Sequence, residues 1–356
     1  MLDVVALGEL LIDFTSSGFS ERGSELFEKN PGGAPANVLV SVSKLGKRTS
    51  FIGKTGNDCF GAFLRDALLA EGVDTEGMVF SDSVNTTLAF VHLNKKGDRS
   101  FSFYRNPGAD MMLTEEEIRF ELIDKARIFH FGSVSMTNEP ARNATLKAAE
   151  YAKGAGILVS YDPNLRMQLW KNSDEARAAI EGGLKYADLL KISEGEMLFL
   201  TGEADPDKGF DYLLRKYGIS LILVTLGKKG SFYRLEGHTG HAFAYNVKTI
   251  DTTGAGDDRL VGAAKLCKKN GINPVYVSLG IASGLKFASQ SGESVNAIQK
   301  NISVNEIEGT IKKICSIRAS DSIFTQIVNF YEIISQEVTI DNIVTFAEQI
   351  KSNELK

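Results

Sequence analysis

Short runs of apolar residues alternate along the chain with longer segments in which apolar residues recur every three or four positions. The short runs predict buried strands, and the longer segments predict amphipathic helices. The expected strands cover residues 4–8, 50–52, 127–131, 157–161, 189–192 and 221–225. The expected helices cover residues 35–45, 60–70, 140–153, 174–186, 194–201 and 207–217. This alternation predicts an α/β fold, a doubly wound and mostly parallel sheet with helices on both faces.

Two segments depart from this alternation. Residues 86–93 and 99–104 alternate in strand fashion around a polar turn and predict a hairpin. Residues 14–30 are irregular and contain two glycines. We expect about residues 14–31 and 86–106 to form a small β-sheet lid. Such a lid covers a site or pairs with another copy of the chain as a homodimer, and an edge hairpin without function is the alternative.

The segment after about residue 303 has a different character. It contains no proline, and no glycine after Gly309. Residues 322–335 and 339–351 have the spacing of amphipathic helices. We therefore expect a main domain over residues 1–315 and a helical C-terminal extension of unknown role over residues 316–356.

Composition narrows the function classes. The chain has 356 residues and 43% hydrophobic content, enough to bury a substantial core. Its net charge is −5 and it has no long basic stretch, so nucleic acid is not an expected partner. No apolar run approaches the roughly 20 residues that span a bilayer, and the N-terminus lacks a signal-peptide pattern, so we expect no membrane partner and a cytoplasmic location. Cys59, Cys267 and Cys315 are scattered and are expected to be buried, reduced thiols.

The most informative polar segment is Asp251-Thr252-Thr253-Gly254-Ala255-Gly256-Asp257, which stands just before an apolar run with helical spacing. The N–H groups of Gly254, Ala255 and Gly256 can point together at a helix N-terminus and bind an anion. Asp257 can accept a proton from a hydroxyl group beside that anion. This combination favours phosphoryl transfer to an alcohol, and a plain tight loop is the alternative.

Two further segments place polar or flexible residues where ligands bind in α/β sheets. Gly32-Gly33-Ala34-Pro35-Ala36-Asn37 leads into a predicted helix, and its glycines allow close backbone approach to a ligand. A helix entry with a solvated asparagine is the alternative. Asp162-Pro163-Asn164-Leu165-Arg166 follows a predicted strand, and Arg166 offers a planar fork of donors. A surface salt bridge is the alternative for Arg166.

Two more segments follow predicted strands nearer the middle of the chain. Ser193 and Glu196 come after the strand that ends at residue 192. Glu196 either holds Mg²⁺ through water or simply begins a helix. Thr225-Leu226-Gly227-Lys228-Lys229-Gly230 has spaced glycines that let a nucleotide lie against the backbone, and an ordinary hairpin turn is the alternative. No complete Gly-x-Gly-x-x-Gly follows a strand, so a dinucleotide oxidoreductase is not supported.

The order of these motifs resembles that of the ribokinase-like (PfkB) carbohydrate kinases, and within that family it is closest to the fructokinases. The matching stretches are Gly8-Glu9-x-x-x-Asp13, then Gly32 to Asn37, Asp162 to Arg166, Thr225-x-Gly227-x-x-Gly230, and Asp251 to Asp257. The resemblance covers about residues 3–315. It implies a doubly wound α/β body with a β lid, ATP as phosphate donor, Mg²⁺, and often a monovalent cation such as K⁺.

The resemblance also implies roles for individual residues. Asp257 corresponds to the general base, and Gly254, Ala255 and Gly256 correspond to the anion hole. The positions on the sugar side are Asp13, Gly32, Gly33, Asn37, Arg105, Asn164 and Arg166. Those on the nucleotide side are Lys191, Ser193, Glu196, Thr225, Gly227, Gly230, Gly256 and Gly292. Asp251 corresponds to a position near the monovalent cation, and Glu196 to one that holds Mg²⁺ through water.

These expectations lead to ATP-dependent phosphorylation of a sugar hydroxyl group, with D-fructose as the first candidate and fructose 6-phosphate as product. A 2-keto-3-deoxygluconate kinase is an alternative, because it shares the Asp-Pro-Asn-Leu-Arg signature and because Arg105 with Arg166 would suit a carboxylate. Asp258 and Arg259 stand where the family has a small residue and then Phe. An alternative from another class is therefore a weakly active or inactive paralogue that binds a sugar or nucleotide.

Overall fold

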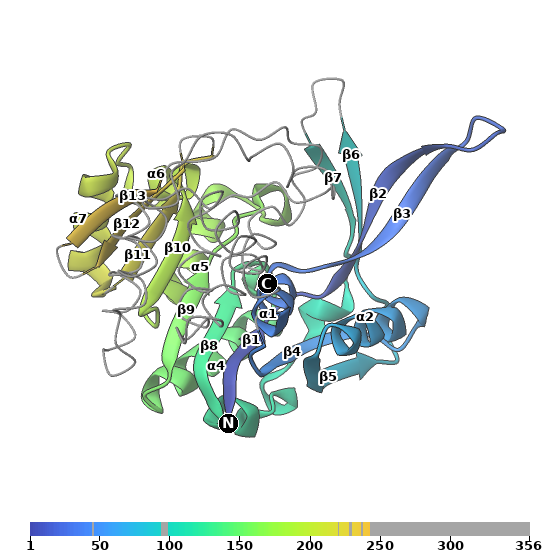
Figure 1. The fold of residues 1–356 in the computed structure, drawn as a ribbon, viewed down its shortest axis with the longest axis horizontal. Coiled ribbons are helices and arrows are strands. Elements are labelled where there is room, and N and C mark those ends of the chain that lie inside the picture. The colour runs from blue at the N-terminus through green and yellow to red at the C-terminus, as the bar shows by residue number, and fades with distance from the viewer. Residues whose placement is uncertain (45, 94–98, 220, 228–229, 236–237, 243–356) are drawn as a thin grey trace, which may run out of the picture. The chain divides into compact units, whose positions relative to one another are not determined.

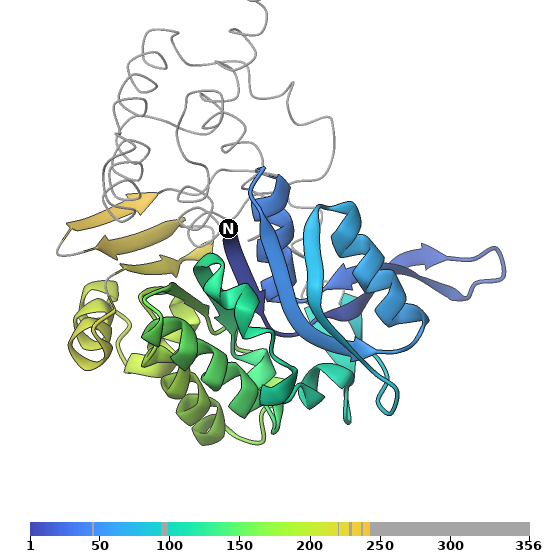
Figure 2. The ribbon, with the colours of Figure 1, turned by 90° about the horizontal axis from the view of Figure 1, so that it is seen from below.

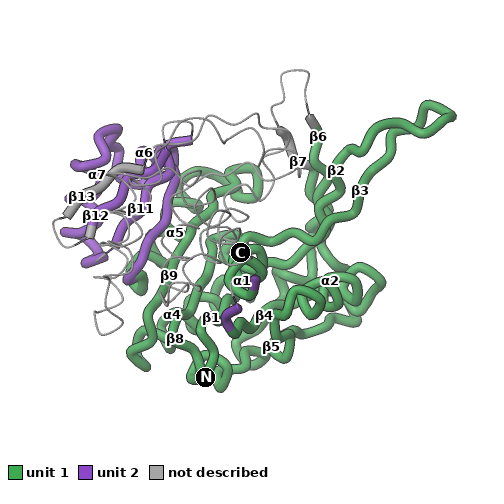
Figure 3. Tube along the Cα trace, in the orientation of Figure 1, with its two compact units in different colours: residues 1–43, 48–187 green, residues 44–47, 188–356 purple. Residues whose placement is uncertain are grey.

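The computed structural model of the chain describes residues 1–44, 46–93, 99–219, 221–227, 230–235 and 238–242. These residues fall into two compact units (Figure 3). The N-terminal unit comprises residues 1–43 and 48–187, and the C-terminal unit comprises residues 44–47 and the chain from Asp188 onward. The predicted extension over residues 316–356 lies outside the described residues, so the boundary at residue 315 stays a prediction.

The main sheet of the N-terminal unit has five parallel strands in the order β9-β8-β1-β4-β5 (Figure 1). Their bounds are β1 (Leu2–Leu7), β4 (Thr49–Gly56), β5 (Val73–Ser81), β8 (Ala126–Gly132) and β9 (Leu158–Asp162). The central strand, β1, has four consecutive residues, Val4 to Leu7, that are completely buried. A parallel strand covered on both faces requires such a continuous apolar run. The predicted strands of this sheet are therefore confirmed.

Helices cover both faces of this sheet (Figure 2). Their bounds are α1 (Ala34–Lys44), α2 (Cys59–Ala70), α3 (Phe120–Asp124), α4 (Ala141–Gly154) and α5 (Ser173–Leu184). Figure 2 shows α1 and α2 on one side and α4 with α5 on the other. In the strand order, β4 and β5 lie on one side of β1, and β8 and β9 lie on the other. Because the connections between parallel strands are right-handed, the helices of the two sides lie on opposite faces of the sheet. The described residues of this unit also form four short 3₁₀ helices: η1 (Ala109–Met112), η2 (Glu115–Glu117), η3 (Val134–Met136) and η4 (Met167–Leu169).

A second, four-stranded sheet belongs to the same unit and has the order β3-β2-β6-β7. Its strands are β2 (Leu11–Phe19), β3 (Glu25–Gly32), β6 (Leu88–Leu93) and β7 (Arg99–Tyr104). Figure 1 shows β2 and β3 extending beyond the main sheet of this unit. The predicted hairpin is confirmed, because β6 and β7 pair antiparallel, and β2 joins them by parallel pairing with β6. Phe14 and Phe90 stack across that junction with ring centroids 4.9 Å apart.

The described part of the C-terminal unit contains four strands in the order β13-β12-β11-β10. Their bounds are β10 (Leu189–Ser193), β11 (Leu221–Thr225), β12 (Ser231–Leu235) and β13 (His238–Ala242). The first two pair parallel, and β11, β12 and β13 pair antiparallel in sequence. Two helices, α6 (Glu194–Thr201) and α7 (Pro206–Tyr217), connect β10 to β11. Both were predicted, and each begins within a residue of its expected start.

One expectation about the cysteines is wrong, because Cys59 is exposed. The buried face of α2 carries Gly61, Leu64 and Leu68, whose spacing follows one side of a helix. Cys59 is the first residue of the helix and lies off that face. Among the helices that the structure describes, none is long and apolar enough to cross a membrane.

Candidate functional site

The two N-terminal motifs meet where the chain leaves the main sheet. Glu9 follows β1, and Asp13 lies on β2, opposite Asn30 of β3. Gly32 ends β3, and a Cβ atom there would overlap the Asp13 carboxylate. Gly33 has φ +127° and its Cα approaches the Glu9 carbonyl group so closely that a Cβ atom would overlap it. The two glycines therefore let the returning strand pack directly against Glu9 and Asp13.

Asn37 belongs to the same arrangement. It lies in the first turn of α1, and its backbone N–H donates to the Gly33 carbonyl oxygen at 3.0 Å. The residue is half-buried. The structure thus brings the predicted sugar-side residues Asp13, Gly32, Gly33 and Asn37 together at the start of α1. Their contact with a sugar stays a prediction.

Glu9, for which the sequence predicts no role, lies at the centre of this junction. Its side chain is buried, and its Oε1 accepts the backbone N–H of Ala34 at 2.9 Å. Its Oε2 is also buried and has no hydrogen-bond partner among the described residues. Burial raises the pKa of Glu9 to about 7, the Asp110 carboxylate adds to this, and the Ala34 N–H and Arg105 oppose it. Glu9 is therefore a carboxyl group that titrates near neutral pH inside the protein.

This pKa predicts a pH-dependent stability. A carboxyl group whose pKa is raised from 4.5 to about 7 stabilises the folded state fully below about pH 4.5, and this contribution is lost as the pH rises through 7. We expect Glu9 to lower the free energy of unfolding by about 2.5 kcal/mol between about pH 5 and about pH 8. Urea unfolding of the natural protein and of Glu9→Gln at both pH values measures this contribution. Identical pH dependence in the two proteins would contradict it.

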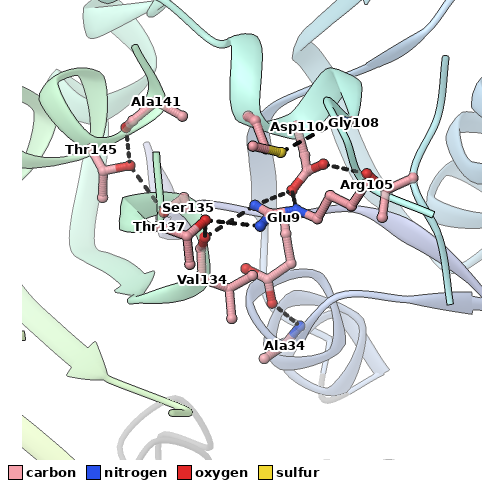
Figure 4. Close-up of polar contacts among 12 residues, drawn as sticks. Glu9, Ala34, Arg105, Gly108, Asp110, Val134, Ser135, Thr137, Ala141 and Thr145 are labelled. Atoms are coloured by element: carbon pink, nitrogen blue, oxygen red, sulfur yellow. Dashed lines mark hydrogen bonds and ion pairs between the residues drawn. The ribbon is translucent and has the colours of Figure 1, made fainter. Parts of the chain in front are cut away.

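Arg105, predicted on the sugar side, is buried and bound within the protein (Figure 4). Its Nε donates to Asp110 Oδ2 at 2.8 Å, and its Nη2 lies 2.7 Å from the same oxygen. Its Nη1 donates to Thr137 Oγ1 at 2.8 Å, and Nη2 also donates to the Val134 carbonyl oxygen at 3.1 Å. These contacts leave little donor capacity for a substrate. A direct sugar contact by Arg105 stays a prediction, and its surroundings favour a role inside the protein.

Asn164 and Arg166 follow the carboxyl end of β9, as predicted. Asp162 Oδ1 accepts the backbone N–H of Asn164 at 3.2 Å, and Asn164 has the left-handed φ of 49°. Asparagine tolerates this conformation because its side chain bonds locally. Arg166 is half-buried, and within the described part of the chain its guanidinium has no hydrogen-bond or ion-pair partner. Arg166 therefore keeps its donors available for a polar ligand.

In the C-terminal unit, the predicted nucleotide-side residues Lys191, Ser193 and Glu196 follow one another along β10 and into α6. Lys191 is half-buried on β10, and Ser193 is the N-cap residue of α6. The Ser193 N–H and Oγ each donate to Glu196 Oε2 at 2.7 Å, and the Glu196 N–H donates back to Ser193 Oγ at 3.2 Å. This is a capping box, which begins the helix as the alternative interpretation of Glu196 expected. The Mg²⁺ role of Glu196 stays a prediction.

The helix cap at Ser193 predicts that substitution of this residue destabilises the protein. We expect Ser193→Ala to lower the free energy of unfolding by about 1 kcal/mol, because the first turn of α6 loses its side-chain acceptor. Asn172→Ala is a matched control, since Asn172 Oδ1 caps α5 by accepting the Glu175 N–H at 2.8 Å. Urea unfolding measures both losses. An unchanged stability of Ser193→Ala would contradict the capping role, and a raised KM for ATP in Ser193→Ala alone would support a nucleotide contact.

The structure describes the predicted nucleotide loop after β11 except for residues 228 and 229. Thr225 is buried at the end of β11, and it pairs with Ser231 of β12. The Leu226 N–H donates to the Gly230 carbonyl oxygen at 2.8 Å. Gly227 and Gly230 have φ of 58° and 98°, which explains glycine at both positions. The described residues thus connect two antiparallel strands, as the hairpin alternative given above expects, and nucleotide contact by this segment stays a prediction.

Several predicted residues lie outside the described residues. These are the anion-hole and base residues Gly254 to Asp257, the cation residue Asp251 and the nucleotide-side Gly292. Within the described part of the chain, no group of three or more His, Cys, Asp or Glu side chains is arranged to hold a metal ion. The predicted metal sites therefore stay predictions.

The chain matches a known protein family over most of its length. A family model described as "pfkB family carbohydrate kinase" matches residues 1–265. The probable chloroplastic fructokinase-6 of Arabidopsis thaliana is 47% identical over 264 residues, which cover 73% of this chain and 68% of that protein. Fructokinase-2 of Oryza sativa subsp. japonica is 49% identical over 257 residues, which cover 71% and 76%.

Solved structures agree with this match. The fructokinase of Xylella fastidiosa with bound ATP superposes with a TM-score of 0.68 at 28% identity, covering 94% of this chain and 98% of that one. The fructokinase of Vibrio cholerae O395 in its fructose-, ADP- and calcium-bound form gives a TM-score of 0.67 at 31% identity, covering 79% and 91%. The family match extends past Asp257 and so includes the predicted catalytic segment.

Proposed function

The chain belongs to the pfkB family of carbohydrate kinases, and on this premise we propose that it transfers the γ-phosphoryl group of ATP to the 6-hydroxyl group of D-fructose. The observation that carries the choice of fructose is the 47–49% identity to fructokinases over more than 70% of the chain. The Vibrio cholerae relative, whose structure contains fructose and ADP, supports the same acceptor and a nucleotide donor. The product is fructose 6-phosphate.

Each group of predicted site residues has its own proposed role in the transfer. Asp257 removes the proton of the sugar hydroxyl group as it attacks the γ-phosphorus atom in line. The N–H groups of Gly254, Ala255 and Gly256 stabilise the negative charge that develops on the transferring group. Asp13 and the other sugar-side residues at the start of α1 bind hydroxyl groups of the acceptor and orient it. We further propose that the second sheet is a lid that excludes water during transfer.

We propose Mg²⁺ as the divalent cation and K⁺ as the monovalent cation. The Vibrio cholerae relative contains calcium in one structure and potassium in another. Mg²⁺, when bound, neutralises charge on the phosphates. Glu196, whose carboxylate lies at the start of α6 beside Ser193, is the residue we propose to contact Mg²⁺ through water. Asp251 is the proposed residue near the monovalent cation.

The second sheet is also our proposed surface for a homodimer. Phe19 and Tyr104 are large hydrophobic side chains on or beside its strands, with exposed fractions of 72% and 67%. Exposed apolar side chains on a sheet favour pairing with another protein surface.

We also propose a cytoplasmic location for this chain, although one relative is named as chloroplastic.

The alternative acceptor, 2-keto-3-deoxygluconate, is less favoured by the geometry. That interpretation assigns the substrate carboxylate to Arg105 and Arg166 together, whereas the Arg105 guanidinium is committed to Asp110 and Thr137. A coupled assay of ADP release with each sugar tests the choice. We expect kcat/KM for fructose to exceed that for 2-keto-3-deoxygluconate by at least about 100-fold. The reverse preference would overturn the proposal.

A further inference from the structure

The chain crosses between the second sheet and the rest of the N-terminal unit four times, and the four crossing points share one buried polar cluster. Glu9 lies between β1 and β2, and Ala34 follows β3. Thr87 stands directly before β6, and Arg105 directly follows β7. Asp110, on η1, completes the cluster. Segments that are far apart in the sequence are therefore joined at the base of the second sheet.

Asp110 connects two of the crossings. Its Oδ1 accepts the Thr87 hydroxyl group at 2.5 Å, and its Oδ2 accepts Arg105 Nε at 2.8 Å. The side chains of Arg105 and Asp110 are 3% and 0% exposed, so the pair is shielded from water. The Thr87 carbonyl oxygen also accepts the Ile12 N–H at 3.1 Å, which ties the start of β6 to β2.

Glu9 connects the other two crossings and lies beside this ion pair (Figure 4). The hydrogen bond from the Ala34 N–H to Glu9 Oε1 joins the entry into β2 to the exit from β3. The Arg105 and Asp110 charges both act on the Glu9 carboxyl group. Gly33 packs against the Glu9 carbonyl group with no room for a Cβ atom. A displacement of Glu9 would therefore move the Gly33 backbone with it.

The proposed sugar-binding residues stand on the two sides of this connection. Asp13 and Gly32 lie on strands of the second sheet, and Asn37 lies on α1. Their spacing depends on how the second sheet is held against the start of α1. Because Glu9 is buried, its carboxyl group is not accessible to a sugar.

We infer that Glu9 is a positioning residue for the acceptor sugar: it fixes the base of the second sheet against α1, so that Asp13 and Asn37 bind the same substrate molecule. This inference rests on the proposed fructokinase function. Loss of the Glu9 contact loosens the sugar side. It leaves unchanged the predicted nucleotide-side residues that the structure describes, which lie on β10, on α6 and beside the turn after β11. The KM for fructose then rises while the KM for ATP does not, because the interaction lost acts on the bound sugar.

The test compares substitutions of Glu9 in the full-length chain. Glu9→Ala removes the acceptor for the Ala34 N–H, and Glu9→Asp shortens the side chain by one methylene group. We expect both to raise the KM for fructose at least about tenfold, with the KM for ATP within about twofold of the natural protein. Glu9→Gln keeps an amide oxygen for Ala34 and is expected to stay within about threefold in both constants.

Glu117→Gln is the matched control, because Glu117 forms an ion pair with Lys54 at 2.5 Å and takes no part in the cluster. It is expected to leave both KM values unchanged. Glu9→Asp carries the test if Glu9→Ala does not fold. An unchanged KM for fructose in Glu9→Ala and Glu9→Asp would overturn the positioning role of Glu9. The same rise of this KM in Glu9→Gln as in Glu9→Ala or Glu9→Asp would also overturn it, and neither result would affect the proposed function. A natural protein without fructose phosphorylation would overturn the proposed function, and this inference with it.

Discussion

Replacing Asp257 with asparagine is expected to lower kcat about 10³-fold while fructose still binds. Asp257 is the carboxylate that directly follows the predicted anion hole of Gly254 to Gly256. A positioned general base contributes typically about 10² to 10⁴ in rate. Asparagine has nearly the same size but cannot accept the proton of the sugar hydroxyl group. Steady-state kinetics give kcat, and calorimetric titration with fructose gives the binding affinity.

Asp258→Asn is the matched control for this substitution, since it removes the same charge one residue downstream. We expect Asp258 to occupy the first turn of a helix, where a carboxylate interacts only with the helix dipole. Its substitution should therefore leave kcat within about threefold of the natural protein, because dipole contributions are typically below about 1 kcal/mol. Near-normal turnover in Asp257→Asn would contradict the assignment of the base.

Replacing Asp110 with alanine is expected to lower the free energy of unfolding by about 3–5 kcal/mol. The substitution leaves the Arg105 guanidinium, which is 3% exposed, without its carboxylate partner. It also removes the acceptor of the Thr87 hydroxyl group, which donates at 2.5 Å. An unpaired charge that water cannot reach is among the most costly changes in a folded protein. Urea unfolding measures the loss.

Asp66→Ala is the control for the ion pair of Arg105 and Asp110. Asp66 forms an ion pair with Arg65 at 2.8 Å, but its side chain is 64% exposed. Its loss should cost less than about 1 kcal/mol, because water screens surface pairs. The double variant Arg105→Met with Asp110→Leu should recover part of the loss by removing both charges. A cost for Asp110→Ala as small as that of Asp66→Ala would contradict the structural role of the buried pair.

The fold could be predicted from the sequence wherever burial imposes a strong pattern. The apolar run at Val4 to Leu7 had to be a buried strand, and it is the centre of the main sheet. The strand β5 was missed because Asp74, Thr75, Glu76 and Gly77 interrupt its apolar residues. β5 lies at the end of the strand order, where only one neighbour is needed and polar residues are tolerated.

The strands β2 and β3 were predicted only as part of a small β-sheet lid over about residues 14–31, without bounds of their own, and the second sheet confirms that sheet. Ser16, Ser17 and Gly18 have low β-propensity, and the last three residues of β2 are exposed. β2 and β3 are strands because their backbones pair with each other, as in the register of Thr15 with Glu28. Backbone pairing between two polar segments leaves little signal in the sequence.

The candidate site was only partly predictable. Glycines at Gly32 and Gly33 indicated close backbone approach, and the structure shows that approach against Glu9 and Asp13. The role of Glu9 depends on the Ala34 N–H, which lies 25 positions along the chain, and a lone glutamate after a strand gives no sign of such a partner. The environment of Arg105 likewise depends on residues that η1 and η3 bring together in space.

Identification of the product shows whether this chain phosphorylates fructose at its 6-hydroxyl group, as we propose. The purified chain is incubated with ATP, Mg²⁺, K⁺ and fructose, and the phosphorylated product is examined by ³¹P NMR against authentic sugar phosphates. We expect fructose 6-phosphate, formed in equal amount to ADP. Fructose 1-phosphate as the product, or ADP release without any sugar phosphate, would contradict it.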